Sequence, residues 1–347
     1  MLEKNSHLAR RVVGYGEIVD KYIVLVPTPK DEEKVLSNKV KVYGVGGRGK
    51  ILKFLRVFNL AKKLLQGEDY DLITVQDQYY LAWLAWKLAR QFKIGLEIQV
   101  HGFEKFFGWR KMIAKFVIPR ADAIRVVSQR LKKQMIDDFG VKEEKITVVP
   151  IYVERISHIA YRTSPDGKFI FLTVSRLVPV KNIEMQIEAL AIIVKQFPGA
   201  KLWIVGDGVE RKKLEKICYE LHVTRYVTFF GWQNDLGKFY SQADAFLLTS
   251  NYEGWGMVII EAASFGLPII MTDVGCAGEV IKDGESGIVI PVGGQKELEA
   301  AMRKIIEDED LRQKLGEGAK KAVEELPSRG ETLKLYLESW RKACGNF

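Results

Sequence analysis

Short apolar runs alternate with segments of helical periodicity along the whole chain, and this alternation constrains the fold more than any other feature. The apolar runs are bounded by glycine, proline or polar residues, as strands usually are. Strands that alternate with helices indicate parallel sheets covered by helices. We expect strands at residues 22–26, 40–43, 72–75, 96–100, 123–127 and 146–149, and again at 169–174, 201–205, 227–230, 245–249, 269–272 and 287–290. The sequence therefore predicts an α/β protein with two similar sheets.

The length of the chain predicts two domains. A chain of 347 residues exceeds the size at which a single hydrophobic core stops growing. Regular apolar periodicity lapses over residues 150–166, so we expect a first domain at 1–153 and a second at 154–330. The remaining segment, 331–347, begins with a predicted helix.

The cysteines and histidines argue against disulfides and against a bound metal. Cys218, Cys276 and Cys344 are widely scattered and show no CxxC spacing. The four histidines do not cluster in the sequence, so no metal site is expected. With no run of about 18 apolar residues and no signal peptide, the chain is expected in the cytoplasm.

All of the excess positive charge lies in the first half of the chain. Residues 1–153 hold 28 Lys and Arg against 17 Asp and Glu, whereas the remainder holds 25 against 27. Such an excess favours an anionic partner, which could be a lipid surface, a phosphorylated acceptor or nucleic acid. Nucleic acid ranks last, because no zinc knuckle, RNP-like aromatic motif or arginine-rich arm is present. We expect no nucleic-acid partner.

The densest basic segment covers residues 103–120, where aromatic and basic side chains recur at roughly helical spacing. A helix of this kind can lie in a membrane interface, with Phe and Trp on its apolar side. A surface helix whose aromatics pack on their own domain shows the same pattern. Peripheral contact with the inner face of a membrane is therefore one of two open interpretations.

Two carboxylates stand in an unusual setting near residues 250–263. Glu253 is followed by Gly-Trp-Gly, and eight residues later Glu261 interrupts the apolar run 257–263, which predicts a buried helix. A buried carboxylate needs hydrogen-bond donors, and sugar hydroxyls would supply them. The N-terminus of such a helix also favours a phosphate. The alternative is that Glu261 pairs with a structural Arg or Lys and that Glu253 is a loop acid.

A pair of cations follows the predicted strand at 169–174. Arg176 and Lys181 lie in the loop between this strand and a predicted helix at 183–196, where open α/β sheets bind ligands. Together they could neutralise a diphosphate, although ordinary loop charges would look the same. Gly206 and Asp207 belong to a Gly-Asp-Gly turn after the next strand, which either lets the backbone approach a ligand or is an ordinary turn.

The order and spacing of these motifs resemble the family 4 retaining glycosyltransferases of the GT-B fold. The resemblance rests on Ser-Arg-Leu at 175–177 with Lys181, the Gly-Asp-Gly turn, the two glutamates Glu253 and Glu261, and the glycine-containing stretch 275–287. It implies two Rossmann-like domains that face each other across a cleft, with the segment after 330 crossing back to the first domain. It also implies metal-independent sugar transfer, with retention, from a UDP or GDP sugar that is a substrate; no cofactor is expected.

The resemblance assigns roles to single residues. Arg176 and Lys181 would hold the donor diphosphate, and Glu261 would bind the ribose hydroxyls. Glu253 would lie beside the donor sugar. The remaining expected donor contacts are the backbone amides around Gly256, Met257 and Val258, the turn with Gly206 and Asp207, and Trp232 near the nucleobase.

The first half of the chain resembles the family more weakly, through His101. It follows the predicted strand 96–100, and in the family it would face the donor sugar, although a lone His before Gly is often only a turn residue. The first domain departs from the family at its start. Family members open with a strand and a glycine-rich loop, whereas residues 5–13 of this chain already resemble the helix that follows them. The first strand is thus expected to be missing, which would expose sheet edges.

Two rival functions remain open. The same fold could hydrolyse or epimerise a nucleotide sugar. It could also bind a nucleotide sugar without turnover, because its first loop is absent. The acceptor is expected to be anionic or lipid-linked on grounds of charge and resemblance alone.

Overall fold

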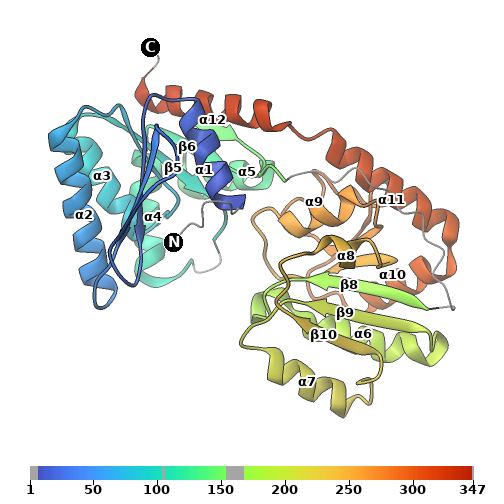
Figure 1. Cartoon of the computed structure of the whole chain (residues 1–347). Coiled ribbons are helices and arrows are strands. Elements are labelled where there is room, and N and C mark those ends of the chain that lie inside the picture. Colours follow the sequence, from blue (N-terminus) through green and yellow to red (C-terminus); the bar gives the residue numbers. More distant parts are fainter. Residues whose placement is uncertain (1–6, 104–105, 154–167, 346–347) are drawn as a thin grey trace. The chain divides into compact units, whose positions relative to one another are not determined.

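A computed structural model describes residues 7–103, 106–153 and 168–345 of the chain (Figure 1). The chain forms two compact units. Unit 1 comprises residues 1–149 and 327–347, and unit 2 comprises residues 150–326. The expected domain boundary at 153/154 adjoins residues 154–167, which lie outside the described part, as do residues 5 and 6 of the expected first helix.

Unit 2 is built on one six-stranded sheet in the order β10-β9-β8-β11-β12-β13. Every pairing in it is parallel. The strands are β8 (Phe169–Val174), β9 (Ala200–Val205), β10 (Val227–Gly231), β11 (Ala245–Leu248), β12 (Ile269–Thr272) and β13 (Ile288–Ile290). The apolar runs of the sequence predicted all six strands, and the signal is clearest for β11 and β12, which are buried throughout.

The helices of unit 2 supply the rest of its core. They are α6 (Ile183–Gln196), α7 (Arg211–Glu220), α8 (Gly237–Tyr240), α9 (Met257–Ser264), α10 (Gln295–Glu307) and α11 (Glu309–Glu324). Ile187, Leu190 and Ile193 of α6 are fully buried against Phe171 and Leu202 of the sheet. This core is apolar and continuous, so it fixes the loops at the end of the sheet.

Unit 1 contains two sheets, and the expected single sheet is therefore wrong. β1 (Tyr22–Pro27), β3 (Val40–Val45) and β2 (Glu32–Val35) form one sheet, with β3 in the middle. The other sheet has the order β4-β5-β6-β7 and comprises β4 (Leu72–Val75), β5 (Gly95–Val100), β6 (Ala123–Val126) and β7 (Ile146–Val148). Within the described residues β1 and β4 are edge strands that do not pair with each other.

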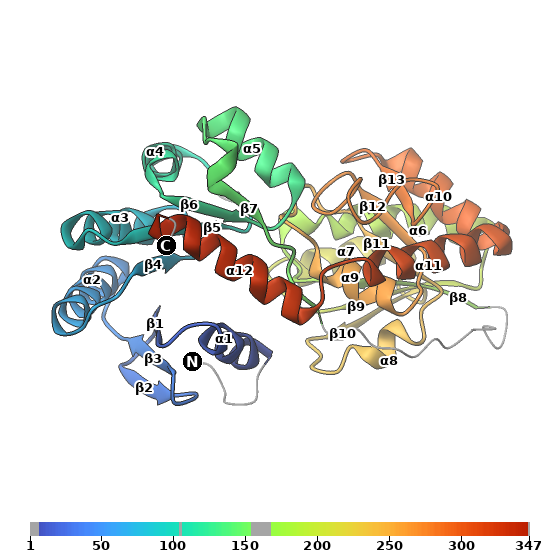
Figure 2. The ribbon, with the colours of Figure 1, turned by 90° about the horizontal axis from the view of Figure 1, so that it is seen from above.

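The helices that pack on these sheets come from two parts of the sequence, the N-terminal segment and the C-terminal segment. They are α1 (His7–Glu17), α2 (Lys50–Gly67), α3 (Tyr80–Phe92), α4 (Gly108–Val117), α5 (Gln129–Phe139) and α12 (Arg329–Cys344). A capping box of Ser328 and Glu331 begins α12, which then crosses the four-stranded sheet (Figure 2). Of the expected helix over 103–120, residues 104 and 105 lie outside the described part. The described residues form α4 and then a short 3-10 turn at Ile118–Arg120, while Phe103 is buried and stacks on Phe139.

Candidate functional site

A cavity of about 210 Å³ opens where the central strands of unit 2 end. It lies beside the residues that follow β8 and β11 and beside the first turn of α9. Its lining comprises Thr173, Val174, Ser175, Arg176, Lys181, Ile183, Gln186, Leu248, Thr249, Ser250, Glu253, Gly256, Met257 and Val258. The structure thus brings together six of the residues that the sequence singled out, at the sheet edge where α/β proteins bind ligands.

The loop after β8 is tied to the end of β11. Its last turn is a 3-10 helix, Pro179–Lys181, which ends at Asn182 in the left-handed conformation with φ of 48°. Thr249 donates its hydroxyl to the carbonyl oxygens of Lys181 and Asn182, at 3.2 and 2.9 Å. The position of the Lys181 backbone therefore does not depend on a ligand.

Lys181 and Glu253 form an ion pair in the cavity wall. The Lys181 Nζ lies 2.5 Å from Glu253 Oε1, and their side chains are only 14% and 11% exposed. Ser250 donates its hydroxyl to the same oxygen at 2.7 Å. The sequence predicted both charged residues but neither this pairing nor the role of Ser250. The pair places a cation on a flexible aliphatic chain next to a carboxylate that also accepts a hydrogen bond from Ser250.

The N-terminus of α9 faces the same cavity. Gly256 precedes the helix with φ of 94°, a conformation that favours glycine. The first backbone N–H groups of a helix have no intrahelical acceptor, so those at Met257 and Val258 can donate to an anion. The helix dipole adds to the positive potential there.

Glu261 does not sit in the cavity lining, and the prediction of a buried carboxylate at this position is wrong. It is half-buried, because it lies on the exposed side of α9 while Ile259, Ile260 and Ala262 are buried. Tyr240 donates its hydroxyl to Glu261 Oε2 at 2.7 Å. Burial, followed by the Glu261 charge, raises the pKa of Tyr240 well above its usual value, so this hydroxyl stays a donor.

Gly206 and Asp207 support the loop after β8. Gly206 has φ of 129°, and a Cβ at this position would lie 1.9 Å from the carbonyl oxygen of Ser175. The carbonyl of Asp207 accepts a hydrogen bond from the Leu177 N–H at 2.9 Å. The carboxylate of Asp207 accepts from the N–H of Gly208 at 2.7 Å. Close packing of the two backbones therefore explains why glycine occupies position 206.

Trp232 extends from the loop after β10. Its side chain is 71% exposed, and its indole N–H donates to Asn234 Oδ1 at 3.3 Å. An exposed ring of this kind is free to stack on a planar group. It is not part of the cavity lining.

His101 belongs to unit 1 and follows β5. Burial, with smaller contributions from the charges of Arg125 and Arg11, lowers its pKa to about 4, so the imidazole is neutral at physiological pH. Its Nε2 has no hydrogen-bond partner within the described residues. Glu97 and Gln99 precede His101 on the same face of β5, since successive side chains of a strand alternate.

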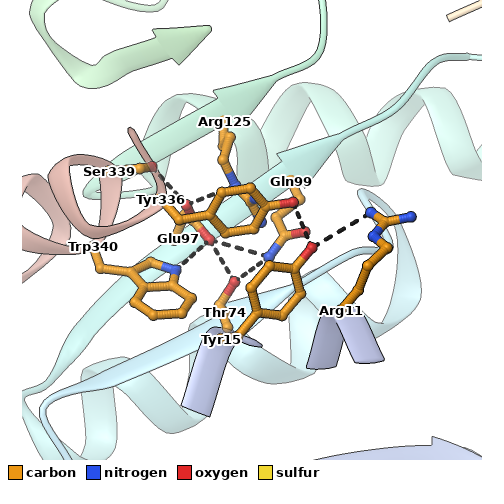
Figure 3. A network of polar contacts seen from close by, with 9 residues as sticks. All are labelled: Arg11, Tyr15, Thr74, Glu97, Gln99, Arg125, Tyr336, Ser339 and Trp340. Atoms are coloured by element: carbon orange, nitrogen blue, oxygen red, sulfur yellow. Dashed lines mark hydrogen bonds and ion pairs between the residues drawn. The ribbon is translucent and has the colours of Figure 1, made fainter. Parts of the chain in front are cut away.

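A buried polar network connects this face of β5 to α12 (Figure 3). Glu97 is its centre: Arg125 Nε donates to it at 3.2 Å, Ser339 at 2.5 Å and Trp340 Nε1 at 3.2 Å. Thr74 donates its hydroxyl to Glu97 as well. Glu97 and Arg125 are at most 3% exposed, so a charge pair holds the C-terminal helix onto the sheet.

The same network reaches α1 through a pair of tyrosines. Tyr15 donates its hydroxyl to Tyr336 at 2.7 Å, and Arg11 donates to Tyr15 at 3.4 Å. The guanidinium of Arg125 lies over the Tyr336 ring, 3.4 Å from its centre. Burial raises the pKa of Tyr15 to about 12. This network was not predicted from the sequence. Its signal there is three polar residues, Glu97, Gln99 and Arg125, inside predicted buried strands.

Two further observations apply to the described residues alone. No three or more His, Cys, Asp or Glu side chains gather there in a way that could hold a metal ion. No helix in the same part of the chain is long and apolar enough to span a membrane.

Two α/β units, one with a cavity at the carboxyl edge of its parallel sheet, form the GT-B fold. The family described as "Glycosyl transferases group 1" matches residues 155–322, and that described as "Glycosyltransferase Family 4" matches residues 19–154. Together the two matches cover residues 19–322, and the chain is a glycosyltransferase of the group 1 and family 4 type.

Individual relatives agree with this family. The lipopolysaccharide core biosynthesis glycosyltransferase LpsE of Rhizobium meliloti is 32% identical over 175 residues, which are 50% of each chain. Sucrose-phosphate synthase from Thermosynechococcus elongatus has the same fold, with a TM-score of 0.83 over 98% of this chain and 93% of that one, at 20% identity. Anabaena HepE, solved with UDP and glucose, has a TM-score of 0.72 over 86% and 85%, at 22% identity.

The alignments with the curated relatives are partial. They span 50%, 58% and 54% of the length of the first three. The family and the fold follow from these matches.

Proposed function

We propose that the chain transfers a sugar from a nucleotide-diphosphate donor to an acceptor hydroxyl, with retention at the anomeric carbon and without a metal ion. The observation that carries the proposal is the cavity of unit 2, where Arg176, Lys181 and the N-terminus of α9 surround one space. These three groups suit a diphosphate, which carries negative charge and accepts several hydrogen bonds.

In this proposal the donor phosphate competes with Glu253 for Lys181. In the structure Lys181 is paired with Glu253. A phosphate in the cavity would attract the flexible ammonium group, while Ser250 continues to hold the carboxylate. Glu253 is then available to orient a sugar hydroxyl. Its proposed role is to position the sugar, not to form a covalent bond with it.

The proposed step breaks the bond between the anomeric carbon and the phosphate oxygen. The acceptor oxygen forms a new bond to the anomeric carbon on the same face, and its proton passes to the departing phosphate. Negative charge therefore builds on the phosphate in the transition state. Arg176, Lys181 and the first amides of α9 would stabilise that charge.

The rest of the donor would extend from the cavity along unit 2. Glu261 is proposed to accept hydrogen bonds from ribose hydroxyls beside Tyr240, Trp232 to lie near the base, and the Gly206 and Asp207 turn to support the phosphate loop. Structures of Anabaena HepE hold UDP, which favours UDP over GDP as the donor nucleotide. His101, which is neutral, is proposed to hydrogen-bond to the donor sugar.

An anionic or lipid-linked acceptor and a cytoplasmic location complete the proposal. The positive charge of residues 1–153 supports such an acceptor, and contact of the segment 103–120 with the inner face of a membrane would bring the chain to it. The three cysteines are free thiols, as is usual in a reducing compartment.

Product analysis tests the proposed reaction. The purified chain is incubated with UDP-glucose, UDP-N-acetylglucosamine or GDP-mannose, with and without a lipid extract as acceptor, in the presence of EDTA. Transfer predicts an acceptor-dependent glycoside with the donor's anomeric configuration. Free sugar without acceptor would indicate hydrolysis, an altered sugar nucleotide would indicate epimerisation, and binding without any product would indicate an inactive binding protein.

Variants tie the reaction to the cavity. R176A and K181A should each lower turnover about 100-fold, as the loss of one group that stabilises transition-state charge typically does. K216A, at an exposed lysine of α7, is the matched control and should retain activity. Unchanged turnover in R176A and K181A would contradict the assignment, and so would a covalent glycosyl adduct on Glu253.

A further inference from the structure

Three consecutive helices of unit 1 contain no acidic residue. α2, α3 and α4 together carry ten Lys and Arg and no Asp or Glu. The next helix, α5, differs, since Asp137 and Asp138 offset its basic residues. The excess charge of the first half of the chain is therefore concentrated on one stretch of its surface.

Large apolar side chains are exposed on the same three helices. On α4, Trp109 is 71% and Met112 61% exposed, and Phe107 just before the helix is 71% exposed. On α2, Ile51 is 78% exposed. The other exposed apolar side chains of this region are Leu52, Leu55, Tyr80, Trp83 and Phe116. Solitary exposed apolar residues are normal, but a group of nine on neighbouring helices indicates an interaction surface.

Ring contacts show that the three helices form one continuous surface. Phe54 of α2 lies 5.9 Å from Tyr80 of α3, and Trp86 of α3 lies 5.1 Å from Phe116 of α4, measured between ring centres. The three helices also follow one another in space in the ribbon views (Figures 1 and 2). We refer to the exposed side chains of α2, α3 and α4, with Phe107, as the α2–α4 face.

The charge of the α2–α4 face is almost unneutralised. Of the ten cations on α2, α3 and α4, only Arg56 pairs with a carboxylate within the part of the chain that the structure describes, namely that of Asp31 at 2.8 Å. Lys87 instead lies over the Trp83 ring, 3.9 Å from its centre. Bases that flank exposed aromatic rings match a bilayer surface, whose headgroups are anionic and whose interface accommodates Trp and Phe.

We propose that the α2–α4 face binds an anionic lipid bilayer. The apolar side chains enter the interface while Lys111, Lys115 and their neighbours contact lipid phosphates. The inference widens the membrane contact of segment 103–120 to three helices. The role of this binding rests on the proposed function, because a bilayer would present a lipid-linked acceptor to the enzyme. The binding itself does not require transfer activity.

Sedimentation with vesicles tests the proposal on the full chain. One set of vesicles contains phosphatidylcholine alone and the other contains phosphatidylcholine with phosphatidylglycerol. The wild type should bind the anionic vesicles at least tenfold more tightly, and added salt should release it. The measurement needs no donor or acceptor, so its outcome is separate from that of the transfer assay.

Two variants and one control locate the contact. K111Q/K115Q should weaken binding to anionic vesicles about 30-fold, and W109Q/M112Q about tenfold or more. V209Q/Y219Q alters side chains of unit 2 that are 85% and 75% exposed, and it should bind like the wild type. All of these side chains are on the surface, and circular dichroism verifies that each variant is folded.

Three outcomes would overturn the proposal. Equal binding to both kinds of vesicle would exclude an anionic lipid surface as the partner. Unchanged binding in K111Q/K115Q and W109Q/M112Q would place the contact elsewhere. A dimer without vesicles that W109Q/M112Q dissociates in analytical ultracentrifugation would show that a second copy of the chain covers this face.

Discussion

The two units are both α/β structures, yet they bury polar residues in different places. In unit 2 the middle of the six-stranded sheet is apolar, and the charged pair of Lys181 and Glu253 lies where the strands end. In unit 1 the charged pair of Glu97 and Arg125 lies within the sheet itself. Unit 2 thus keeps its charges where a ligand can reach them, whereas unit 1 uses its buried pair to hold helices.

The two units also differ in how many sheets they contain. Unit 2 has six strands in one sheet, whereas in unit 1 β1 and β4 end two separate sheets. Tyr22 of β1 and Leu72 of β4 both pack on a cluster that includes Tyr336 and Trp340 of α12. The C-terminal helix therefore contributes to the cohesion of unit 1 where strand pairing is absent from the described residues.

The largest predicted effect comes from removing the centre of the buried network. E97A leaves Arg125 buried without its carboxylate, which should destabilise unit 1 by about 3–5 kcal/mol in urea unfolding. E143A breaks an exposed pair with Lys132 in the same unit and should unfold at nearly the same urea concentration as the wild type, because solvent screens such a pair. If E97A does not fold, E97M/R125M should restore folding, because it removes both charges. Equal stability of E97A and the wild type would contradict the proposed role of the network.

In unit 2 the largest effect is expected at a glycine. G206A places a Cβ 1.9 Å from the Ser175 carbonyl in a conformation with positive φ, so it should destabilise unit 2 by about 3 kcal/mol or more. G330A, at a position with no neighbour within 4 Å and no positive φ, should be neutral or slightly stabilising. Thermal unfolding compares them, and a G206A protein as stable as the wild type would refute the close packing described above.

A pH effect of intermediate size is expected in unit 1. The pKa of His101 is lowered from 6.5 to about 4, so below pH 6.5 the unfolded chain binds a proton that the folded chain does not. Stability is therefore complete above pH 6.5 and falls as the pH drops toward 4, by about 2 kcal/mol between pH 7 and pH 5.

Substitution isolates that effect. H101N should remove this part of the pH dependence of urea unfolding, and H222N, at an exposed histidine, is the matched control. If wild type and H101N lose the same stability between pH 7 and pH 5, His101 is not buried in its neutral form.

The smallest predicted effect concerns the cavity. S250A removes the hydroxyl that donates to Glu253, so it should reduce stability by about 1 kcal/mol. It should also reduce turnover more than donor affinity if Glu253 orients the sugar. Steady-state kinetics separate the two quantities, and a variant with wild-type kcat would argue against that role for Ser250.

The sequence predicted unit 2 better than unit 1, for physical reasons. Apolar runs predicted all six strands of its sheet and a helix at 257–263, which the structure forms as α9, because most of these segments lie in the apolar core. β2 was not predicted, since Glu32 and Glu33 make it resemble a loop and an edge strand needs little apolar surface. Which strands pair is not encoded in periodicity, so the two sheets of unit 1 were not predicted either.

The sequence predicted which residues belong to the candidate site, but not which of them contact one another. Spacing and resemblance singled out Arg176, Lys181 and Glu253, which the structure brings to one cavity. The ion pair between Lys181 and Glu253 joins residues 72 positions apart, and no local pattern predicts such a partner. Glu261 was expected to be buried because its neighbours are apolar, but its side chain lies on the half-exposed side of the helix.

The central claim is that the cavity of unit 2 holds the diphosphate of a nucleotide sugar. Isothermal titration of UDP and of GDP into the wild type and into R176A/K181A, with EDTA present, tests it most directly. The account predicts one bound nucleotide per chain and at least about 100-fold weaker binding to the variant, since two charge-assisted contacts are lost. Equal affinity for wild type and variant, or no binding of either nucleotide to the wild type, would contradict it.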